Sequence, residues 1–313
     1  MKEIDYAKRK KRASRKDDLA LHIMAIPGTV NLLVFAYWPM YGLLIAFKKY
    51  ITRKGIMGSE WVGLSNFEFL FASNDSWILV RNTIGYNLIF ILVNLVLAVG
   101  LALLLNELHS KRFAKVVQTI YIMPYFLSMS AVAIIVYSFL GNPNGALTTL
   151  CRNLGLGEIA FYQEPKYWPF FFVIINAWKS VGYSAIVYLA TISGISKEYY
   201  EAAMLDGATK VQQMRFITLP QMRTIICVLL IMSMGGIFSG DFGLFYSVTY
   251  NSRTLYAAGV SKIMDTYIYD AFKVLQNYGL SVAAGFFQSV VGLVAVLISN
   301  KIVNKIEPDN ALF

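Results

Sequence analysis

Long apolar runs alternate with short polar segments along most of the chain. Each run is at least as long as the roughly 20 residues that an α-helix needs to cross a bilayer. The runs cover residues 19–47, 83–106, 116–140, 167–195, 224–246 and 280–303. This pattern predicts an all-α polytopic membrane protein with six transmembrane helices.

Two of these runs contain residues that interrupt helices. Pro124 lies inside the third run, where we expect a kink. Four glycines crowd the end of the fifth run, namely Gly235, Gly236, Gly240 and Gly243. They predict either a broken helix whose backbone faces a water-filled cavity or close helix packing through small residues. The segment 247–279 is mixed in polarity, which is compatible with partial re-entry into the membrane.

The polar segment 196–223 carries the clearest helix boundaries in the chain. Ser196 is a typical N-cap, and Thr209 with Gln212 has the spacing of a capping box. Gly207 permits a turn that a residue with a Cβ atom would resist. Pro220 ends the second helix or begins the next. We therefore predict two short helices with a sharp bend, held at the membrane surface.

Composition supports a membrane protein. The chain of 313 residues is 57% apolar and 15% charged, whereas a soluble domain has about 25% charged residues. The formal net charge is +10, and Lys and Arg are concentrated in the tail 1–18 and in short loops. No aromatic and basic nucleic-acid-binding module accompanies them. The excess positive charge on one side places both termini and the segment 196–223 in the cytosol.

The N-terminus and the two cysteines add little. The first apolar run is too long for a cleavable signal peptide and has no small-residue cleavage site, so we expect it to remain as an anchor. Cys151 lies in a loop and Cys227 lies in a predicted span, on opposite sides of the membrane. A disulfide between them is not expected.

A motif within 196–223 resembles a known family. The spacing E-A-A-x(3)-G-x(9)-I-x-L-P is similar to the EAA loop of ABC-importer permease subunits. Segments 178–183, 240–246 and 265–269 look like the carbohydrate-uptake branch, which includes polysaccharide and oligosaccharide importers. The resemblance runs from residue 19 to the end. It assigns ATPase coupling to Glu201, Ala202, Ala203, Asp206, Gly207, Ile217, Leu219 and Pro220.

The resemblance implies a MetI-like, type I importer permease with cytosolic coupling helices in the cytoplasmic membrane. It implies a second permease subunit, giving a heterodimer, together with two ABC ATPase subunits and an extracellular sugar-binding lipoprotein. ATP and Mg would bind to the ATPase subunits, and this chain would bind no cofactor or metal. Carbohydrate, in particular an oligosaccharide, would be the substrate, and membrane lipid would surround the spans.

Charged and aromatic residues in and near the fourth and fifth runs are candidates for the substrate path. They are Trp178, Lys179, Tyr183, Asp241, Phe242, Phe245 and Tyr246. Charges inside spans usually face a cavity or a partner, so Lys179 and Asp241 could line the path or form an ion pair, or Lys179 could reach a carbonyl. The aromatic residues could stack on sugar rings or could face lipid or the core. For Asn87, Asn94 and Asn176, hydrogen bonding between helices is the expected role.

Other functional classes lack their signatures. The chain has no G-x-x-x-x-G-K-[ST] motif, so ATP hydrolysis is expected in separate subunits. A secondary transporter or channel for a small polar solute is the alternative, but no inverted repeat or paired membrane carboxylate is visible. A membrane-embedded enzyme is disfavoured, because Asp241 has no second aspartate to form a dyad and no metal-ligand set is present. The sequence therefore predicts a transport subunit without catalytic residues.

Overall fold

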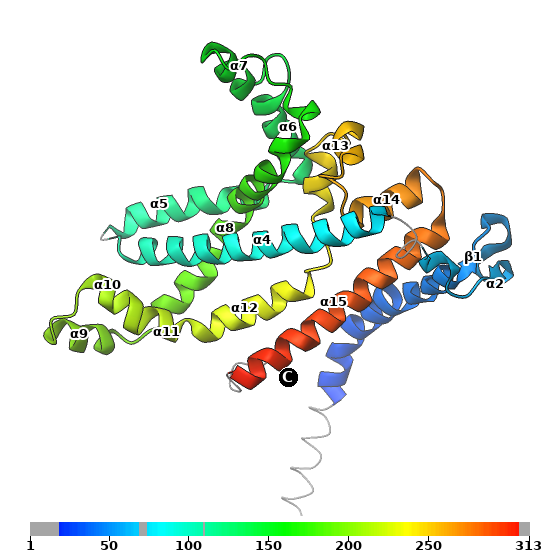
Figure 1. Ribbon diagram of the computed structural model, residues 1–313. Coiled ribbons are helices and arrows are strands. Elements are labelled where there is room, and N and C mark those ends of the chain that lie inside the picture. The colour runs from blue at the N-terminus through cyan, green and yellow to red at the C-terminus, as the bar shows by residue number, and fades with distance from the viewer. Residues whose placement is uncertain (1–18, 69–73, 109, 307–313) are drawn as a thin grey trace, which may run out of the picture.

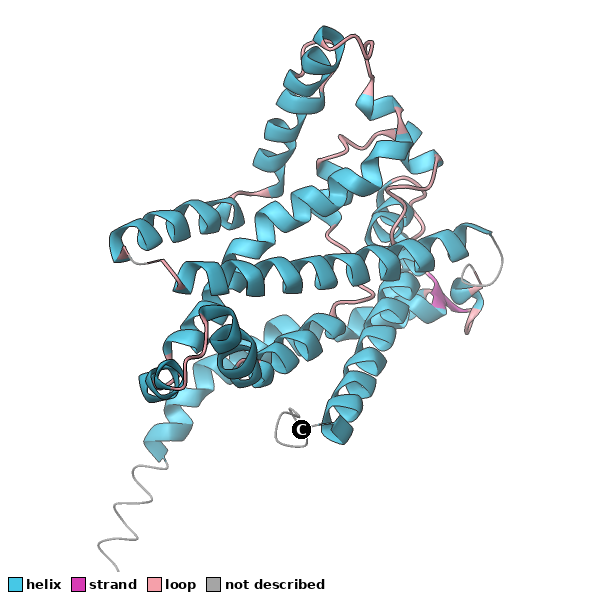
Figure 2. Cartoon of the chain, turned by 60° about the vertical axis from the view of Figure 1, so that its left-hand side comes forward, coloured by secondary structure: helices cyan, strands magenta, loops and turns pink. Residues whose placement is uncertain are grey.

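The computed structural model describes residues 19–68, 74–108 and 110–306, and the predicted basic tail 1–18 lies outside them (Figure 1). Within these ranges the only strands are β1 (Lys48–Lys49) and β2 (Glu60–Trp61). They form a short antiparallel hairpin with Lys48 opposite Trp61 (Figure 2). The all-α prediction is thus confirmed.

Four helices of the described chain are long and apolar enough to cross a membrane: Leu19–Phe47, Ser76–Asn106, Pro165–Ser193 and Tyr278–Lys305. Two bent helix pairs meet the same test together, namely Lys111–Phe126 with Met129–Leu140 and Lys210–Gln221 with Arg223–Gly235. Six spans are therefore found when each bent pair is counted as one.

The main helices are α4 (Asn74–Asn106), α5 (Lys111–Ile122), α6 (Met129–Leu140), α7 (Ala146–Asn153), α8 (Trp168–Ser193), α9 (Lys197–Leu205), α10 (Lys210–Gln213), α11 (Leu219–Gln221), α12 (Arg223–Gly235), α13 (Arg253–Ala257), α14 (Met264–Lys273) and α15 (Tyr278–Ile306). A one-turn helix, α2 (Gly55–Gly58), lies in the β-hairpin loop. The first span ends in a π turn (Leu33–Tyr37) and a 3-10 helix (Trp38–Phe47).

Helix α4 begins earlier than predicted, at Asn74 instead of residue 83. Arg81 and Asn82 interrupt the apolar run, which hid the first turns of the helix from the sequence pattern. Asn82 is nevertheless buried, because its Nδ2 donates to the carbonyl oxygens of Gly259 and Lys262. A polar residue at this position therefore connects distant segments instead of ending the helix.

Helices α4, α8 and α12 cross the centre of the molecule, and α15 packs on α12, α14 and residues 38–47 (Figure 1). The most extensive contact between two helices is that of α4 with α8, where Ala98, Ala102 and Ala185 are fully buried. Small side chains let helices approach closely in a membrane. The α6–α7 arm extends from the body at one end, and α9, α10 and α11 lie at another (Figure 1).

The base of the α6–α7 arm rests on a large aromatic core. Phe172 and Phe245 are fully buried, with ring centroids 4.3 Å apart. Trp168 packs against Phe172, and its Nε1 donates to the carbonyl oxygen of Phe161 at 2.8 Å. Buried aromatic rings supply large contact areas, and a buried indole N–H needs a partner. This core holds α8, α6 and the segment after α12 together.

The third span is sharply bent. Its two halves form an angle of 103° at an elbow comprising residues 123–128. A 3-10 turn, Met123–Phe126, contains Pro124, and Ser128 then caps α6 by accepting from Ala131 N–H. The predicted kink at Pro124 is confirmed, although the change of direction is much larger than a single proline normally causes.

The fifth span is not one helix over 224–246, so this predicted extent was wrong. Helix α12 ends at Gly235, residues 236–242 form a loop, and a π turn follows at Gly243–Ser247. The glycines also pack closely. A Cβ on Gly292 of α15 would lie 3.0 Å from the Gly235 carbonyl oxygen. The break in the helix and the close packing are therefore both present, and exposure of this backbone to a water-filled cavity stays a prediction.

The segment 247–279 folds back over the start of α4. The Oη of Tyr86 donates to the Val260 carbonyl oxygen at 3.0 Å, and Met264 N–H donates to Thr83 Oγ1 at 2.9 Å. These bonds hold α13 and α14 beside the helical core. Re-entry of this segment into the membrane stays a prediction.

The close contact of α5 with α8 gives a test of the packing. A Cβ on Gly182 would run into the carbonyl oxygen of Tyr121, whereas a Cβ on Gly100 in α4 would meet nothing within 4 Å. We expect Gly182→Ala to lower the free energy of unfolding by about 1–3 kcal/mol, because the helices must separate. Gly100→Ala should leave it unchanged or slightly raised. Thermal unfolding of both variants in detergent measures the difference, and equal behaviour would contradict the packing described.

Candidate functional site

Residues 197–221 form a helical hairpin, here called the coupling hairpin, built from α9, α10 and α11. Its first helix begins where predicted, because Ser196 Oγ accepts the N–H of Glu198 at 3.3 Å. Glu198 lies in the first turn, where the positive end of the helix dipole favours a carboxylate.

The bend of the hairpin depends on Gly207. Its φ is +78°, a left-handed conformation that glycine adopts without steric penalty. Ala208 N–H donates to the Ala203 carbonyl at 2.8 Å, and Gly207 N–H donates to the Met204 carbonyl at 3.1 Å. This is the Schellman arrangement, in which both bonds satisfy carbonyls at the end of α9. The predicted turn at Gly207 is thus confirmed.

A capping box starts the second arm of the hairpin, as predicted. Thr209 N–H donates to Gln212 Oε1 at 2.7 Å, and Gln212 N–H donates to Thr209 Oγ1 at 3.4 Å. The helix continues from α10 through a π turn, Met214–Thr218, into α11, where Pro220 occupies the first turn. The two arms are therefore short and defined at both ends.

Contacts on its inner side brace the hairpin. The hydroxyls of Tyr200 and Thr218 are 2.9 Å apart and connect the two arms. The buried Gln213 donates from Nε2 to the Ala208 carbonyl at 3.2 Å. Lys210 Nζ lies 3.4 Å from a carboxylate oxygen of Glu107, at the end of α4. The hairpin therefore has a defined shape and a connection to α4.

The outer side of the hairpin exposes apolar side chains. Leu205 is 90% exposed, Val211 70% and Phe216 67%. Among the predicted coupling residues, Glu201, Ala202, Asp206, Gly207 and Pro220 are exposed, while Ala203, Ile217 and Leu219 are partly buried. Exposed apolar groups on a rigid projection are typical of a protein-protein contact.

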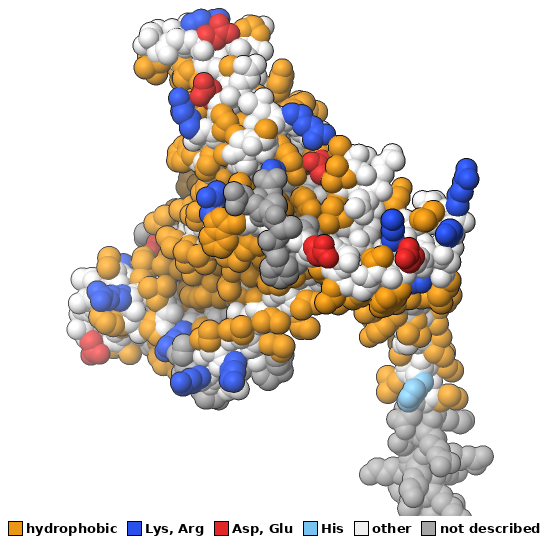
Figure 3. All heavy atoms as spheres, turned by 45° about the vertical axis from the view of Figure 1, so that its right-hand side comes forward, with side chains coloured by type: hydrophobic (Ala, Val, Ile, Leu, Met, Phe, Trp, Pro, Cys, Tyr) orange, Lys and Arg blue, Asp and Glu red, His pale blue; other side chains and the backbone are white. Residues whose placement is uncertain are grey.

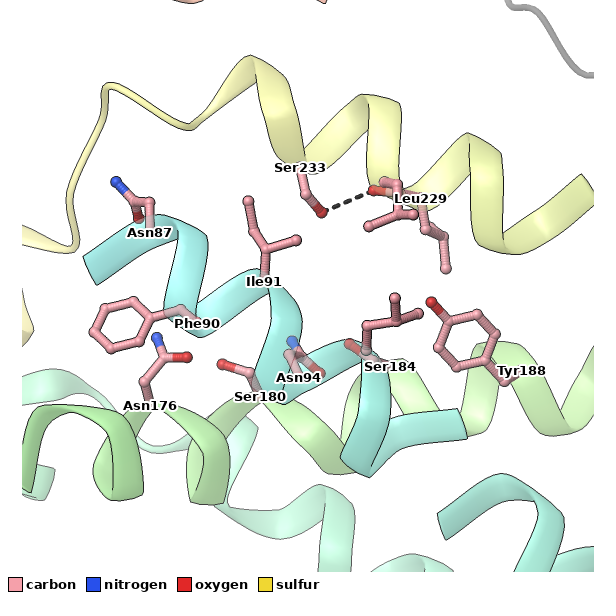
Figure 4. Close-up of a pocket in the computed structure, with 12 residues that line it drawn as sticks. Asn87, Phe90, Ile91, Asn94, Asn176, Ser180, Ser184, Tyr188, Leu229 and Ser233 are labelled. Carbon is pink, nitrogen blue, oxygen red and sulfur yellow. Dashed lines mark hydrogen bonds between the residues drawn. The ribbon is translucent and has the colours of Figure 1, made fainter. Parts of the chain in front are cut away.

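A second feature is a polar cavity of about 240 Å³ between α4, α8 and α12 (Figure 4). Its polar lining comprises Asn87 and Asn94 from α4, Asn176, Ser180, Ser184 and Tyr188 from α8, and Ser233 from α12. Amide and hydroxyl groups make up about half of this lining, apolar side chains of α4 and α12 make up the rest, and none of the lining residues is charged at neutral pH.

Two asparagines have distinct roles at the cavity. Asn87 donates from Nδ2 to the carbonyl oxygens of Ile237 and Ser239, both at 3.0 Å, which matches the predicted bonding between segments. Asn94 differs, because its Oδ1 is buried without a hydrogen-bond partner among the described residues. A buried acceptor of this kind is stabilised when a hydroxyl or water donates to it.

The predicted substrate-path residues on α8 lie outside the cavity lining. Trp178 and Tyr183 are nearly half exposed on the isolated chain, and the Tyr183 ring stacks on Tyr125 with a centroid distance of 4.5 Å. Lys179 donates from Nζ to the carbonyl oxygens of the elbow. Of the three alternatives for Lys179, the structure shows the bond to a carbonyl.

The predicted substrate-path residues after α12 also lie outside the cavity lining. Asp241 caps the following π turn, since its Oδ1 accepts Leu244 N–H at 3.1 Å. Phe242 stacks on Tyr246 with a centroid distance of 4.7 Å, and Tyr246 donates to the hydroxyl of Tyr269. Phe245 is 2% exposed and belongs to the aromatic core. Their proposed role in substrate passage stays a prediction.

Ser180, Ser184, Tyr188 and Ser233 line the cavity but were not among the predicted site residues. The sequence of the fourth apolar run nevertheless contains a pattern that indicates this polar face. Asn176, Ser180, Ser184 and Tyr188 follow one another at intervals of four residues, which places them on one helix face. A polar stripe within an apolar span indicates a face turned away from lipid.

Comparison with known proteins agrees with these features. Residues 98–308 match the family model described as binding-protein-dependent transport system inner membrane component. The polygalacturonan/rhamnogalacturonan transport system permease protein YteP of Bacillus subtilis is 34% identical over 285 residues, covering 91% of this chain and 88% of that protein. Protein LplB of the same organism is 35% identical over 297 residues, covering 95% and 92%.

A solved structure is similar over nearly the whole chain. It is the crystal structure of a bacterial ABC transporter involved in the import of the acidic polysaccharide alginate, with a TM-score of 0.85 and 33% identity over 94% of this chain and 98% of that chain. A second structure of a bacterial alginate ABC transporter, in complex with an alginate pentasaccharide-bound periplasmic protein, gives a TM-score of 0.84 and 34% identity. The chain therefore belongs to the family of membrane-embedded permease components of binding-protein-dependent ABC transport systems.

Proposed function

We propose that this chain is one permease subunit of an ATP-driven importer that takes up carbohydrate, in particular an oligosaccharide. The observation that carries the proposal is the similarity to a polygalacturonan/rhamnogalacturonan transport permease and to an alginate importer, which extends over more than nine-tenths of the chain. The family match over residues 98–308 includes the coupling hairpin. The substrate class comes from these relatives, whose names specify polygalacturonan, rhamnogalacturonan and alginate.

The coupling hairpin would sit in a cleft of an ATPase subunit. Its exposed Leu205, Val211 and Phe216 would be covered there, which removes apolar surface from water. ATP binding would draw two ATPase subunits together and move the hairpin as a lever. A change of state requires contacts that differ between the two states, and a hairpin braced by the bond between Tyr200 and Thr218 can transmit such a difference.

The assembly would contain a second permease subunit of similar fold, two ATPase subunits and an extracellular sugar-binding lipoprotein. ATP and Mg would bind to the ATPase subunits, and this chain would supply the membrane path without catalytic groups. The apolar surface of the long helices fits a multi-pass position in the cytoplasmic membrane (Figure 3). Both termini would lie in the cytosol, with the α6–α7 arm toward the outside.

The cavity between α4, α8 and α12 would contribute to the sugar path. Serine, tyrosine and asparagine side chains can donate and accept, as recognition of sugar hydroxyls requires. The unpartnered Oδ1 of Asn94 would accept from a passing hydroxyl. The cavity on this subunit alone would hold part of a chain, with the partner subunit completing the passage.

Coupling is tested by the backbone of Gly207. Proline cannot adopt its φ of +78°, so we expect Gly207→Pro to disrupt the bend and reduce uptake by at least about tenfold, with normal membrane insertion. Ala203→Asp should have the same effect. The control is Gly155→Pro, since Gly155 has a φ of +76° in the loop after α7. Uptake of labelled oligosaccharide and immunoblots of membranes are the measurements. Intact uptake by the Gly207→Pro variant would refute the coupling role.

The sugar path is tested at Ser180. Alanine lacks the hydroxyl of serine and is otherwise the same, so Ser180→Ala should raise the half-saturating sugar concentration by roughly tenfold through loss of a hydrogen bond to the sugar. Ser138→Ala is the matched control, because Ser138 is exposed on α6 and, among the described residues, its hydroxyl bonds to the Ile134 carbonyl of its own helix. Concentration-dependent uptake is the measurement. An equal effect of both substitutions would argue against sugar passage through the cavity.

The orientation is tested with single cysteines. With Cys151 and Cys227 replaced by serine, Leu154→Cys should react with a membrane-impermeant maleimide in intact cells, since it lies beyond the α6–α7 arm. Leu205→Cys, on the coupling hairpin, should react only after the membrane is permeabilised. Both side chains are strongly exposed on this chain, and the permease is expressed without ATPase subunits, so access to the reagent is limited only by the membrane. The opposite labelling pattern would reverse the proposed topology.

A further inference from the structure

Helix α8 is hydrogen-bonded to three neighbouring carbonyl groups in the elbow of the third span. Lys179 Nζ donates to the carbonyl oxygens of Leu127 at 2.6 Å, Tyr125 at 3.0 Å and Pro124 at 3.5 Å. This arrangement joins a straight span to a bent one within a single helical turn of α8.

The chemistry of the lysine matches this position. A lysine ammonium has three N–H donors, and the elbow presents three carbonyl groups. These carbonyls lie where the first half of the span ends, near the negative end of its helix dipole, and that of Pro124 also accepts Leu127 N–H at 3.2 Å. A cation at this place is therefore stabilised, although charges inside spans are otherwise expensive.

Two further contacts of α8 also hold it against the third span. Gly182 lies so close to the Tyr121 carbonyl that a Cβ atom would not fit. Tyr183 stacks on Tyr125 with an interplanar angle of 12°. Lys179, Gly182 and Tyr183 therefore hold both the helix before the elbow and the turn itself.

The elbow also contacts the broken fifth span. Met129 starts α6 directly after the elbow, and a Cβ on Gly243 would lie 2.6 Å from the Met129 side chain. Helix α6 then leads into the α6–α7 arm, while the opposite end of α8 leads through residues 194–196 into the coupling hairpin (Figure 1). The elbow is thus the point where a displacement of α8 can reach the arm.

We infer that Lys179 is a positioning residue that locks the elbow to α8, so that the α6–α7 arm moves with α8 whenever the coupling hairpin moves. The residue acts through the carbonyls of the elbow and does not contact the sugar. This inference rests on the proposed function, because it concerns how movement of the hairpin reaches the far side of the membrane.

Spin-label distances in the assembled importer test the inference. One pair, Ser138→Cys with Ile174→Cys, reports the position of α6 relative to α8. A second pair, Lys197→Cys with Leu293→Cys, reports the hairpin relative to α15. All four positions are exposed, and Cys151 and Cys227 are replaced by serine. Each pair is measured without nucleotide and with ATP trapped by vanadate, in the wild-type background and with Lys179→Met.

In the wild-type background we expect the hairpin distance to change with nucleotide and the α6–α8 distance to stay constant. With Lys179→Met, the hairpin should still move, but the α6–α8 distance should broaden or shift between the states. Uptake should fall at least tenfold with an unchanged half-saturating sugar concentration. Lys179→Arg should restore part of the uptake. Lys166→Met, which removes an exposed cation paired with Glu164, is the control and should change neither distance.

The outcomes separate the inference from the proposed function. If the hairpin does not move with nucleotide in the wild-type background, the coupling function itself fails. If the hairpin moves and the α6–α8 distance is equally constant with Lys179→Met, the lock is refuted. Should Lys179→Met fail to assemble, Lys179→Gln, which has two N–H donors in place of three and no charge, should loosen the α6–α8 distance in the same direction. A constant distance there would also refute the lock.

Discussion

A membrane interior contains no water to satisfy a broken helix, and this constraint governs the architecture. Both bent spans release backbone carbonyls, and in each case a side chain from a neighbouring straight helix takes them up. Lys179 of α8 bonds the carbonyls of the elbow, and Asn87 of α4 bonds those of Ile237 and Ser239 after α12. The straight helices α4 and α8 therefore form a frame on which the two irregular spans depend.

The frame also separates two kinds of polar residue inside the membrane. In some, such as Lys179 and Asn87, the side-chain donors are bonded to backbone carbonyl oxygens, and these residues stabilise the fold. Others, such as Ser180 and Ser184, line a cavity whose contents can change. A polar residue in a span is therefore informative only together with its partners. This explains why the ionisable Lys179 was a weaker indicator of the cavity than the neutral stripe on the same helix.

The sequence predicted the features that depend on neighbours in the chain. Ser196, Gly207 and Thr209 act within a few residues of themselves, and all three have the predicted geometry. The long spans followed from apolar length alone. The position of the break after Gly235 and the partners of Lys179 depend on which faces of three helices meet. That information is tertiary, and a hydrophobic pattern does not contain it.

Helices α12 and α15 touch through their main chains where Gly235 meets Gly292. The side chain of Val296 lies beside Gly235 at this crossing, so the two helices are in direct contact and can rotate about it but cannot draw closer. The contact acts as a pivot between α12 and α15. When the cytosolic end of α12 moves in one direction, the loop beyond Gly235 must therefore move in the opposite direction. Asn87 connects this loop to α4.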